Sequence, residues 1–320
     1  MLPIAVDALG GDKAPGEIIA GAREAVAAGI DVVLVGPRGL AGCEGFDLIE
    51  ASEVIEMHED AARSVRNKKD STLVRAAEAV RDGKASAMIS AGNTGATMAS
   101  ALLRIGRIAG VKRPAIATPI PTPGTTPTVL LDAGANAEVE PEWRVQLGLM
   151  GSVYAVARFG VKNPRVGLLS IGEEPGKGDT LRKQAYELFL NANNLNFIGN
   201  VEGRDIMTEK VDVVVTDGFT GNVALKTLEG TMRGVVKALF AAISAPEYKE
   251  HADGIMPALL SLYSTFDPDT YGGAILLGVD GVCIISHGSS SSRAMLNGIK
   301  VAKEMVEVDM VGKIRQAVQK

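Results

Sequence analysis

The chain has 320 residues and a formal net charge of −5, with 46% hydrophobic and 22% charged residues. This is an ordinary soluble composition, and its slight acidity argues against a nucleic-acid binder, which usually carries a basic field. Cys43 and Cys283 cannot form a disulfide framework or a metal site by spacing, and no apolar run reaches the roughly 18 residues of a membrane span. We therefore expect a cytoplasmic protein.

Apolar segments typical of buried strands alternate with amphipathic segments along the whole chain. The strand-like segments are PIAVDA, DVVLVG, ASAMIS, PAIATPI, PTVLLDAG, RVGLLSIG, VDVVVTDG and GVCIISHG. Helical patterns such as GEIIAGAREAVAAG, STLVRAAEAVRDG and GNVALKTLEGTMRGVVKALFAAI lie between several of them. Strands without polar alternation, separated by helices, predict a three-layer α/β/α fold with a mostly parallel sheet covered on both faces.

Two segments depart from this rhythm. Residues 118–128, TPIPTPGTTPT, are rich in Pro and Thr and predict a turn that joins two strands. Residues 246–270 contain an apolar stretch with almost no charge, which predicts a helical excursion from a single domain over residues 1–320.

Nearly every strand-like segment ends in a loop of small or acidic residues. These loops are DALGGDKAP, SAGNTG, DAGAN, SIGEEPGKG, TDGFTGN and SHGSSSS. Because ligands of open α/β sheets bind outside the carboxyl ends of the strands, we expect the loops to gather along one edge and share a site. The small residues of SAGNTG let backbone amides approach an anion, and the following helix adds its positive N-terminus.

The usual nucleotide signatures are missing from these loops. Gly10 and Gly11 are adjacent and the next glycine is Gly16, so no G-x-G-x-x-G follows the first strand. The second strand ends VLVGPR, without an acidic residue for a ribose hydroxyl. A P-loop and a G-x-S-x-G elbow are also absent, which disfavours an NTPase and a serine acyl-enzyme.

Several polar side chains at strand ends are open to more than one interpretation. Four aspartates there can hold a metal or, as we favour, accept loop hydrogen bonds: Asp7, Asp12, Asp132 and Asp217. His287 is a general acid/base, a phosphate donor or a structural histidine. Lys177 is an anion contact or a solvated loop lysine. The basic run ARSVRNKKD is a solvated face or a landing site for an acidic partner.

Taken together, the motifs resemble the PlsX family, the acyl-acyl carrier protein:phosphate acyltransferases of bacterial phospholipid synthesis. They occur in the family's order over nearly the whole chain: VDALGGDKAPGEI, RNKKDST, ISAGNTGATMA, RPAIAT, LLDAGAN, LLSIGEEPGKG, GNVEGRDI, DGFTGNVALKT, YGGA and SHGSS. The departures are an indistinct region at 245–270 and extra serines in SHGSSSS. The resemblance implies a fold similar to phosphate acetyltransferase and to isocitrate and isopropylmalate dehydrogenases.

The resemblance also implies the reaction. A long acyl chain passes from the acyl carrier protein thioester to inorganic phosphate, and the acyl phosphate serves a downstream glycerol-3-phosphate acyltransferase at the membrane in phosphatidic acid synthesis. The family is homodimeric and associates peripherally with the inner face of the cell membrane. We expect direct attack by phosphate in a ternary complex, with no acyl-enzyme, cofactor or metal.

Loop position and the resemblance together predict four groups of site residues. The phosphate cradle comprises Ser90, Gly92, Asn93, Thr94 and Gly221, joined by Asn222. His287 and Lys177 neutralise charge or protonate the leaving thiolate. Acyl carrier protein binds at Arg66, Lys68 and Lys69. Ile255, Leu259 and Leu260 contact the membrane or, alternatively, pack in the core or against a dimer partner.

Three other functions stay open at this point. The first is a phosphate acyltransferase that uses acyl-coenzyme A, which competition by acyl carrier protein would distinguish. The second is a non-catalytic membrane scaffold that binds acyl phosphate, although the anion-type loops are intact. The third is a dehydrogenase, which a nicotinamide titration would identify.

Overall fold

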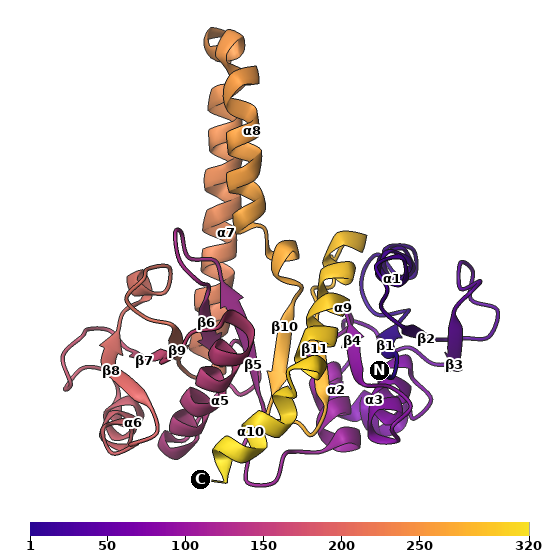
Figure 1. Ribbon diagram of the computed structural model, residues 1–320, viewed down its shortest axis with the longest axis horizontal. Helices are drawn as coiled ribbons and strands as arrows, with labels where there is room; N and C mark the ends of the chain where they lie inside the picture. Colours follow the sequence, from indigo (N-terminus) through magenta and orange to yellow (C-terminus); the bar gives the residue numbers. More distant parts are fainter. Residues whose placement is uncertain (320) are drawn as a thin grey trace.

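The computed structural model describes residues 1–319, apart from the side chains of residues 249–251, 253 and 268. Within these residues, eleven strands form one sheet in the order β3-β2-β1-β4-β11-β10-β5-β6-β9-β7-β8 (Figure 1). Their bounds are β1 Ile4–Asp7, β2 Val32–Gly36, β3 Asp47–Glu50, β4 Ala87–Ser90, β5 Ala115–Ile120, β6 Thr128–Leu131, β7 Arg165–Leu169, β8 Asn196–Val201, β9 Val213–Val215, β10 Ala274–Leu277 and β11 Val282–Ile285.

The sheet consists of two parallel groups that run in opposite directions. Strands β3, β2, β1, β4 and β11 are mutually parallel, and so are β6, β9, β7 and β8. Between them, β10 pairs antiparallel with β11 and β5, and β5 pairs antiparallel with β6. The mostly parallel sheet is confirmed. The turn predicted for residues 118–128 does join two strands, but it is shorter than expected, because residues 118–120 belong to β5 and the connection spans 121–127. The expectation that all strand-end loops gather along one edge is wrong, because the central reversal turns one group around.

Helices cover both faces, as predicted. Their bounds are α1 Gly16–Ala27, α2 Ala61–Asn67, α3 Thr72–Arg81, α4 Thr94–Ser100, α5 Pro141–Phe159, α6 Thr180–Leu190, α7 Gly218–Ile243, α8 Lys249–Phe266, α9 Ser292–Glu307 and α10 Met310–Val318. Helices α1, α5, α6, α9 and α10 pack on one face through the largest buried cluster. Helices α2, α3, α4 and the base of α7 pack on the other face.

Alternate residues of each central strand enter opposite layers of this core. In β1, Ile4 and Val6 pack under α1 and α9, whereas Ala5 packs under α3, and all three are fully buried. Both faces of the strand therefore need apolar side chains, which explains why the sequence shows continuous apolar runs without polar alternation.

A pair of long helices projects from the sheet (Figure 1). Helix α7 has 26 residues, or about 39 Å at 1.5 Å per residue, and its buried residues are Gly218 and Gly221 at its base. Helix α8 returns alongside it, so the helical excursion predicted for 246–270 is the second arm of a hairpin. In the described part of the chain, no helix is long and apolar enough to cross a membrane.

Candidate active site

The loops after β1, β4 and β11 are joined by a short buried network. The Ser90 hydroxyl donates to Asp7 Oδ2 at 2.7 Å and accepts from the Gly92 amide at 2.9 Å. The Ser286 amide donates to the Ser90 carbonyl at 2.8 Å. These contacts hold SAGNTG and SHGSSSS beside the first loop. The Ser90 hydroxyl uses its only proton in this network, so it fixes the loop and has no proton left for a phosphate oxygen.

Asp7 is the buried centre of that network. Burial raises the pKa of its carboxyl group, and hydrogen bonds from Ser90 and Thr72 oppose the rise. Gly10 lies against it so closely that a Cβ there would be 2.4 Å from Asp7 Oδ2. A side chain at position 10 therefore collides with the carboxylate, which explains the glycine in DALGG by contact and not by nucleotide binding.

Helix α4 begins at the tip of SAGNTG. Asn93 caps it by accepting the Ala96 amide at 3.0 Å, and its side-chain amide donates to the carbonyls of Met57 and Glu59 at 3.0 and 3.2 Å. Thr94 is exposed at the first helical position. The first-turn N–H groups of a helix have no intrahelical acceptor. The donors that this loop offers to an anion are therefore the Thr94 and Gly95 amides and the Thr94 hydroxyl, whereas the Ala96 amide and the Asn93 side chain are engaged.

The loops after β6 and β9 form a second group, in which two aspartates organise the backbone. The Asp132 carboxylate accepts four backbone amides, from residues 116, 134, 135 and 136, at 2.7–3.1 Å. Burial raises the pKa of Asp132, and these hydrogen bonds oppose the rise. Asp217 caps α7 through the Thr220 amide and also binds two arginines, Arg182 at 2.8 Å and the buried Arg144 at 3.6 Å.

In the described part of the chain, the four strand-end aspartates, Asp7, Asp12, Asp132 and Asp217, do not come together as a possible ion site. Among the described residues, three carboxylates lie close enough to share a metal ion, those of Glu173, Glu202 and Asp205. Lys210 already contacts Glu173 and Asp205 at 2.8 and 3.1 Å. An ammonium group thus occupies the place of a cation there.

Gly221 and Asn222 lie in the first turn of α7. A Cβ at Gly221 would be 1.9 Å from the Asp132 carbonyl oxygen, and the Gly221 amide donates to the Asp217 carbonyl at 2.9 Å. Gly221 therefore lets the helix approach the DAGAN loop, and its amide is engaged. Asn222 is exposed, and its side-chain oxygen is 3.6 Å from the position of a Cβ on Gly134.

Helix α7 connects the two groups of loops. Asn222, Lys226 and Glu229 follow each other at helical spacing and share one face, with Asn222 about 10 Å from Glu229 along the axis. Glu229 Oε1 is 3.3 Å from Nε2 of His287, in the loop after β11. Leu225 and Ala135 also pack against the buried cluster that contains Ala96 of α4.

Lys226 and Glu229 are the members of this face that the sequence did not predict. Glu229 Oε2 is 2.9 Å from Lys226 Nζ. Burial alone would raise the pKa of Glu229, yet the contacts with His287 and Lys226 lower it to about 2. The carboxylate is therefore ionised at neutral pH. The i, i+4, i+7 spacing from Asn222 in NVALKTLEG was the signal that could have revealed Lys226 and Glu229.

Lys177 lies apart from that face. It is exposed in the loop after β7, and its side chain lies along Gly172 of the same loop. The described contacts do not bring it to His287 or Asn222. The Glu174 carbonyl accepts the Lys177 amide at 3.0 Å, which closes the loop on itself.

The basic run around α2 is partly structural. Lys68 Nζ donates to the Val54 carbonyl at 2.7 Å and also pairs with Glu59. The hydrogen bond from Lys68 is the main reason that the pKa of Glu59 is lowered to about 2. Lys68 therefore ties α2 to the preceding segment, whereas Arg66 and Lys69 are exposed.

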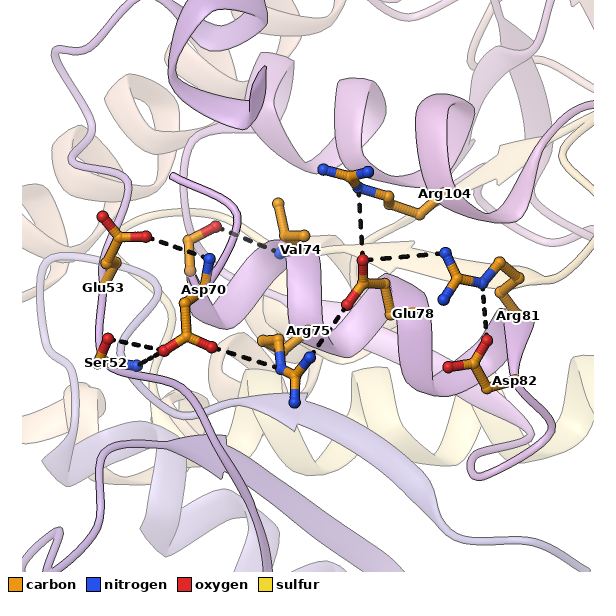
Figure 2. Close-up of polar contacts among 10 residues, drawn as sticks. Ser52, Glu53, Asp70, Val74, Arg75, Glu78, Arg81, Asp82 and Arg104 are labelled. Atoms are coloured by element: carbon orange, nitrogen blue, oxygen red, sulfur yellow. Dashed lines mark hydrogen bonds and ion pairs between the residues drawn. The ribbon is translucent and has the colours of Figure 1, made fainter. Parts of the chain in front are cut away.

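Asp70 ends this basic run, and its carboxylate contacts side chains from a neighbouring loop and from α3. Figure 2 shows Asp70 accepting from Ser52 and contacting Arg75, whose guanidinium also contacts Glu78 on α3. Arg81 and Arg104 approach the same Glu78 carboxylate. The arginines that follow the basic run are thus matched by acids, whereas Arg63, Arg66 and Lys69 of the run itself are exposed.

The three residues predicted to meet the membrane are on α8, but they differ in exposure. Ile255 and Leu260 are exposed, with Leu260 53% exposed. Leu259 is half-buried and lines an apolar groove between α7 and α8, together with Met232, Val236 and Phe240. Leu259 therefore packs within the hairpin.

Comparison with known proteins finds relatives along the whole chain. The pattern of a family described as "Fatty acid synthesis protein" matches residues 2–313. A protein named phosphate acyltransferase from Bacillus pumilus is 46% identical over 325 residues, which cover 99% of this chain and 98% of that protein.

Two solved structures resemble the fold. The EutD phosphotransacetylase of Staphylococcus aureus has a TM-score of 0.62 at 15% identity, covering 95% of this chain and 94% of that one. A 4-hydroxythreonine-4-phosphate dehydrogenase from Klebsiella pneumoniae has a TM-score of 0.54 at 14% identity, covering 96% and 100%. Both likenesses concern the fold alone, and they agree with the layered architecture expected from the sequence.

Proposed function

Because the chain belongs to the fatty acid synthesis protein family and is an acyltransferase, we propose that it transfers a long fatty acyl group from acyl carrier protein to inorganic phosphate. The product is an acyl phosphate, which a glycerol-3-phosphate acyltransferase at the membrane consumes in phospholipid synthesis. The observation that carries the proposal is the 46% identity to a phosphate acyltransferase over nearly the full length of both chains. The strand-end loops of this chain are also intact.

The chemistry suits the groups that the site offers. Phosphate already carries nucleophilic oxygens at neutral pH, so the protein has to orient it against the thioester carbonyl and stabilise the oxyanion. Orientation contributes about 7–11 kcal/mol in favourable cases, and one oxyanion donor about 3–4 kcal/mol. We place the phosphate between the first turn of α4, with Thr94, and the face of α7 that carries Asn222 and Lys226.

The decisive experiment measures acyl phosphate from palmitoyl-acyl carrier protein and phosphate, trapped as the hydroxamate. We expect turnover that requires both substrates and is inhibited by free acyl carrier protein. Turnover with palmitoyl-coenzyme A that ignores acyl carrier protein would assign the donor to coenzyme A. Absence of acyl phosphate with either thioester would contradict the proposal.

The acyl carrier protein is proposed to dock on the exposed cations Arg66 and Lys69. Acidic partners are steered by such charges, and surface pairs act mainly on the association rate. The double variant Arg66→Glu/Lys69→Glu should raise KM for the acyl carrier protein substrate several-fold, with a stronger effect at low salt. Lys162→Glu, an exposed reversal on another face, is the matched control. Equal KM values in the two variants would remove this surface from the proposal.

The α7–α8 hairpin is proposed to pack against a second copy and to touch the inner face of the membrane with its tip. Several large apolar side chains on it are exposed in the single chain, among them Val235, Leu239, Ile255, Leu260 and Leu262. Such a patch marks an interaction surface. Ile255→Glu/Leu260→Glu should lose liposome flotation, and sedimentation should report whether the dimer persists. Undiminished flotation of the folded variant would refute the lipid contact.

A further inference from the structure

Helix α7 carries a half-buried carboxylate, that of Glu229, which contacts two more exposed side chains. The side chain of Glu229 is 11% exposed, whereas those of His287 and Lys226 are 42% and 48% exposed. Each oxygen of the carboxylate contacts one of them, Oε1 with the histidine and Oε2 with the lysine. The carboxylate therefore lies behind the imidazole and the ammonium group, which keep free surface on the solvent side.

We propose that Glu229 is a positioning residue that aims the Nδ1 atom of His287 at the leaving sulfur and one face of Lys226 at the phosphate. The proposal rests on the acyl transfer proposed above and assigns its leaving-group acid and a phosphate contact. Lys226 and Glu229 join the site through the fold, since their partner His287 comes from the far end of the chain.

The geometry selects the nitrogen of His287 that is free. Nε2 lies 3.3 Å from an ionised carboxylate, so this nitrogen carries a proton and is directed at Glu229. Nδ1 is then the ring atom that remains for a substrate. In the same way, Lys226 directs one of its three N–H donors at Glu229 and keeps two for an anion.

The proton balance of the transfer closes with this assignment. A phosphate oxygen forms a bond to the thioester carbon, the C–S bond breaks, and the sulfur takes the proton from Nδ1 of the imidazolium. The monohydrogen phosphate loses one proton on becoming the acyl phosphate, and that proton restores His287. The thiol therefore ends with the proton that phosphate gave up, and no further acid or base is consumed.

The test compares Glu229→Gln, His287→Gln and Lys226→Met with Glu307→Gln, a glutamate on α9 that pairs with Lys303 and serves as control. With acyl carrier protein as leaving group, Glu229→Gln should lower kcat about 10- to 100-fold through misplaced geometry. His287→Gln keeps a donor for Glu229 but lacks Nδ1, and it should lower kcat at least as far. Lys226→Met should mainly raise KM for phosphate.

A leaving group that needs no proton separates this role from a structural one. With an aryl thioester of the same acyl chain, the Glu229→Gln and His287→Gln variants should regain most of the wild-type rate. An equal loss on both thioesters, or no loss on either, would overturn the proposal.

The tautomer of His287 can be determined without any turnover. This measurement therefore tests the positioning role of Glu229 separately from the proposed acyl transfer. In nitrogen-15 NMR of the full chain, which has three histidines, His287 should be protonated at Nε2 when neutral, and Glu229→Gln should weaken that preference. A wild-type signal from the Nδ1–H tautomer would refute the positioning role even if acyl phosphate forms. Absence of acyl phosphate from wild type, with any thioester, would refute the reaction and the acid role with it.

Discussion

Replacing Asp217 by Ala should destabilise the protein far more than a typical surface change. The carboxylate has three tasks: it caps α7 through the Thr220 amide, binds Arg182 at 2.8 Å, and lies 3.6 Å from the guanidinium of Arg144. Arg144 is only 2% exposed, and its Nε and Nη1 have no hydrogen-bond partner among the described residues, so Nη2, which faces Asp217, makes its ion pair. Burial lowers the pKa of this guanidinium, which reflects how poorly its charge is solvated.

The magnitude follows from two separate losses. Removal of an N-cap costs about 1 kcal/mol, and stranding one partner of a buried ion pair costs about 3–5 kcal/mol. Asp217→Ala should therefore lower the free energy of unfolding by about 4–6 kcal/mol, whereas Asp179→Ala, a half-exposed cap on α6, should lower it by about 1 kcal/mol.

The assay is equilibrium unfolding in urea followed by circular dichroism. Asp217→Asn keeps a good cap and a neutral acceptor, so its loss should fall between the other two. The double variant Arg144→Leu/Asp217→Ala removes the stranded charge and should be more stable than Asp217→Ala alone. A loss below 1 kcal/mol for Asp217→Ala, or a double variant less stable than it, would refute the reasoning.

Two further outcomes concern α7. Gly221→Ala places a Cβ 1.9 Å from the Asp132 carbonyl oxygen and should therefore displace the base of α7. We expect the free energy of unfolding to fall by about 1–3 kcal/mol and turnover to decrease. Thermal melts measure the loss of stability, and Gly230→Ala, which has open space around it, is the control. Glu229 has its pKa lowered from 4.5 to about 2, so the stability it contributes is complete above pH 4.5 and is lost as pH falls toward 2. Acid titration of Glu229→Gln should show that part of the pH dependence removed, and superimposable profiles would disprove the contribution.

The strand-end loops show how far local sequence carries the prediction of a site. Small residues after an apolar run correctly located the turns that follow β4, β9 and β11, because backbone geometry at the end of a strand is a local property. Which of these polar atoms are free to bind a ligand, by contrast, depends on residues far away in the chain. The Ser90 hydroxyl and the Asn93 amide are consumed by partners from distant segments, and Lys68 serves as a tether.

The layered α/β fold, the positions of the turns and the family could all be predicted from the sequence, since periodicity and motif order are properties of neighbouring residues. Tertiary structure alone decided that β10 and β5 reverse the sheet, and that α7 crosses from one group of loops to the other. Those outcomes depend on which strands pair and which helix faces meet, and such pairings are set by packing between segments far apart in the chain. The contact of Glu229 with His287 exists for that reason.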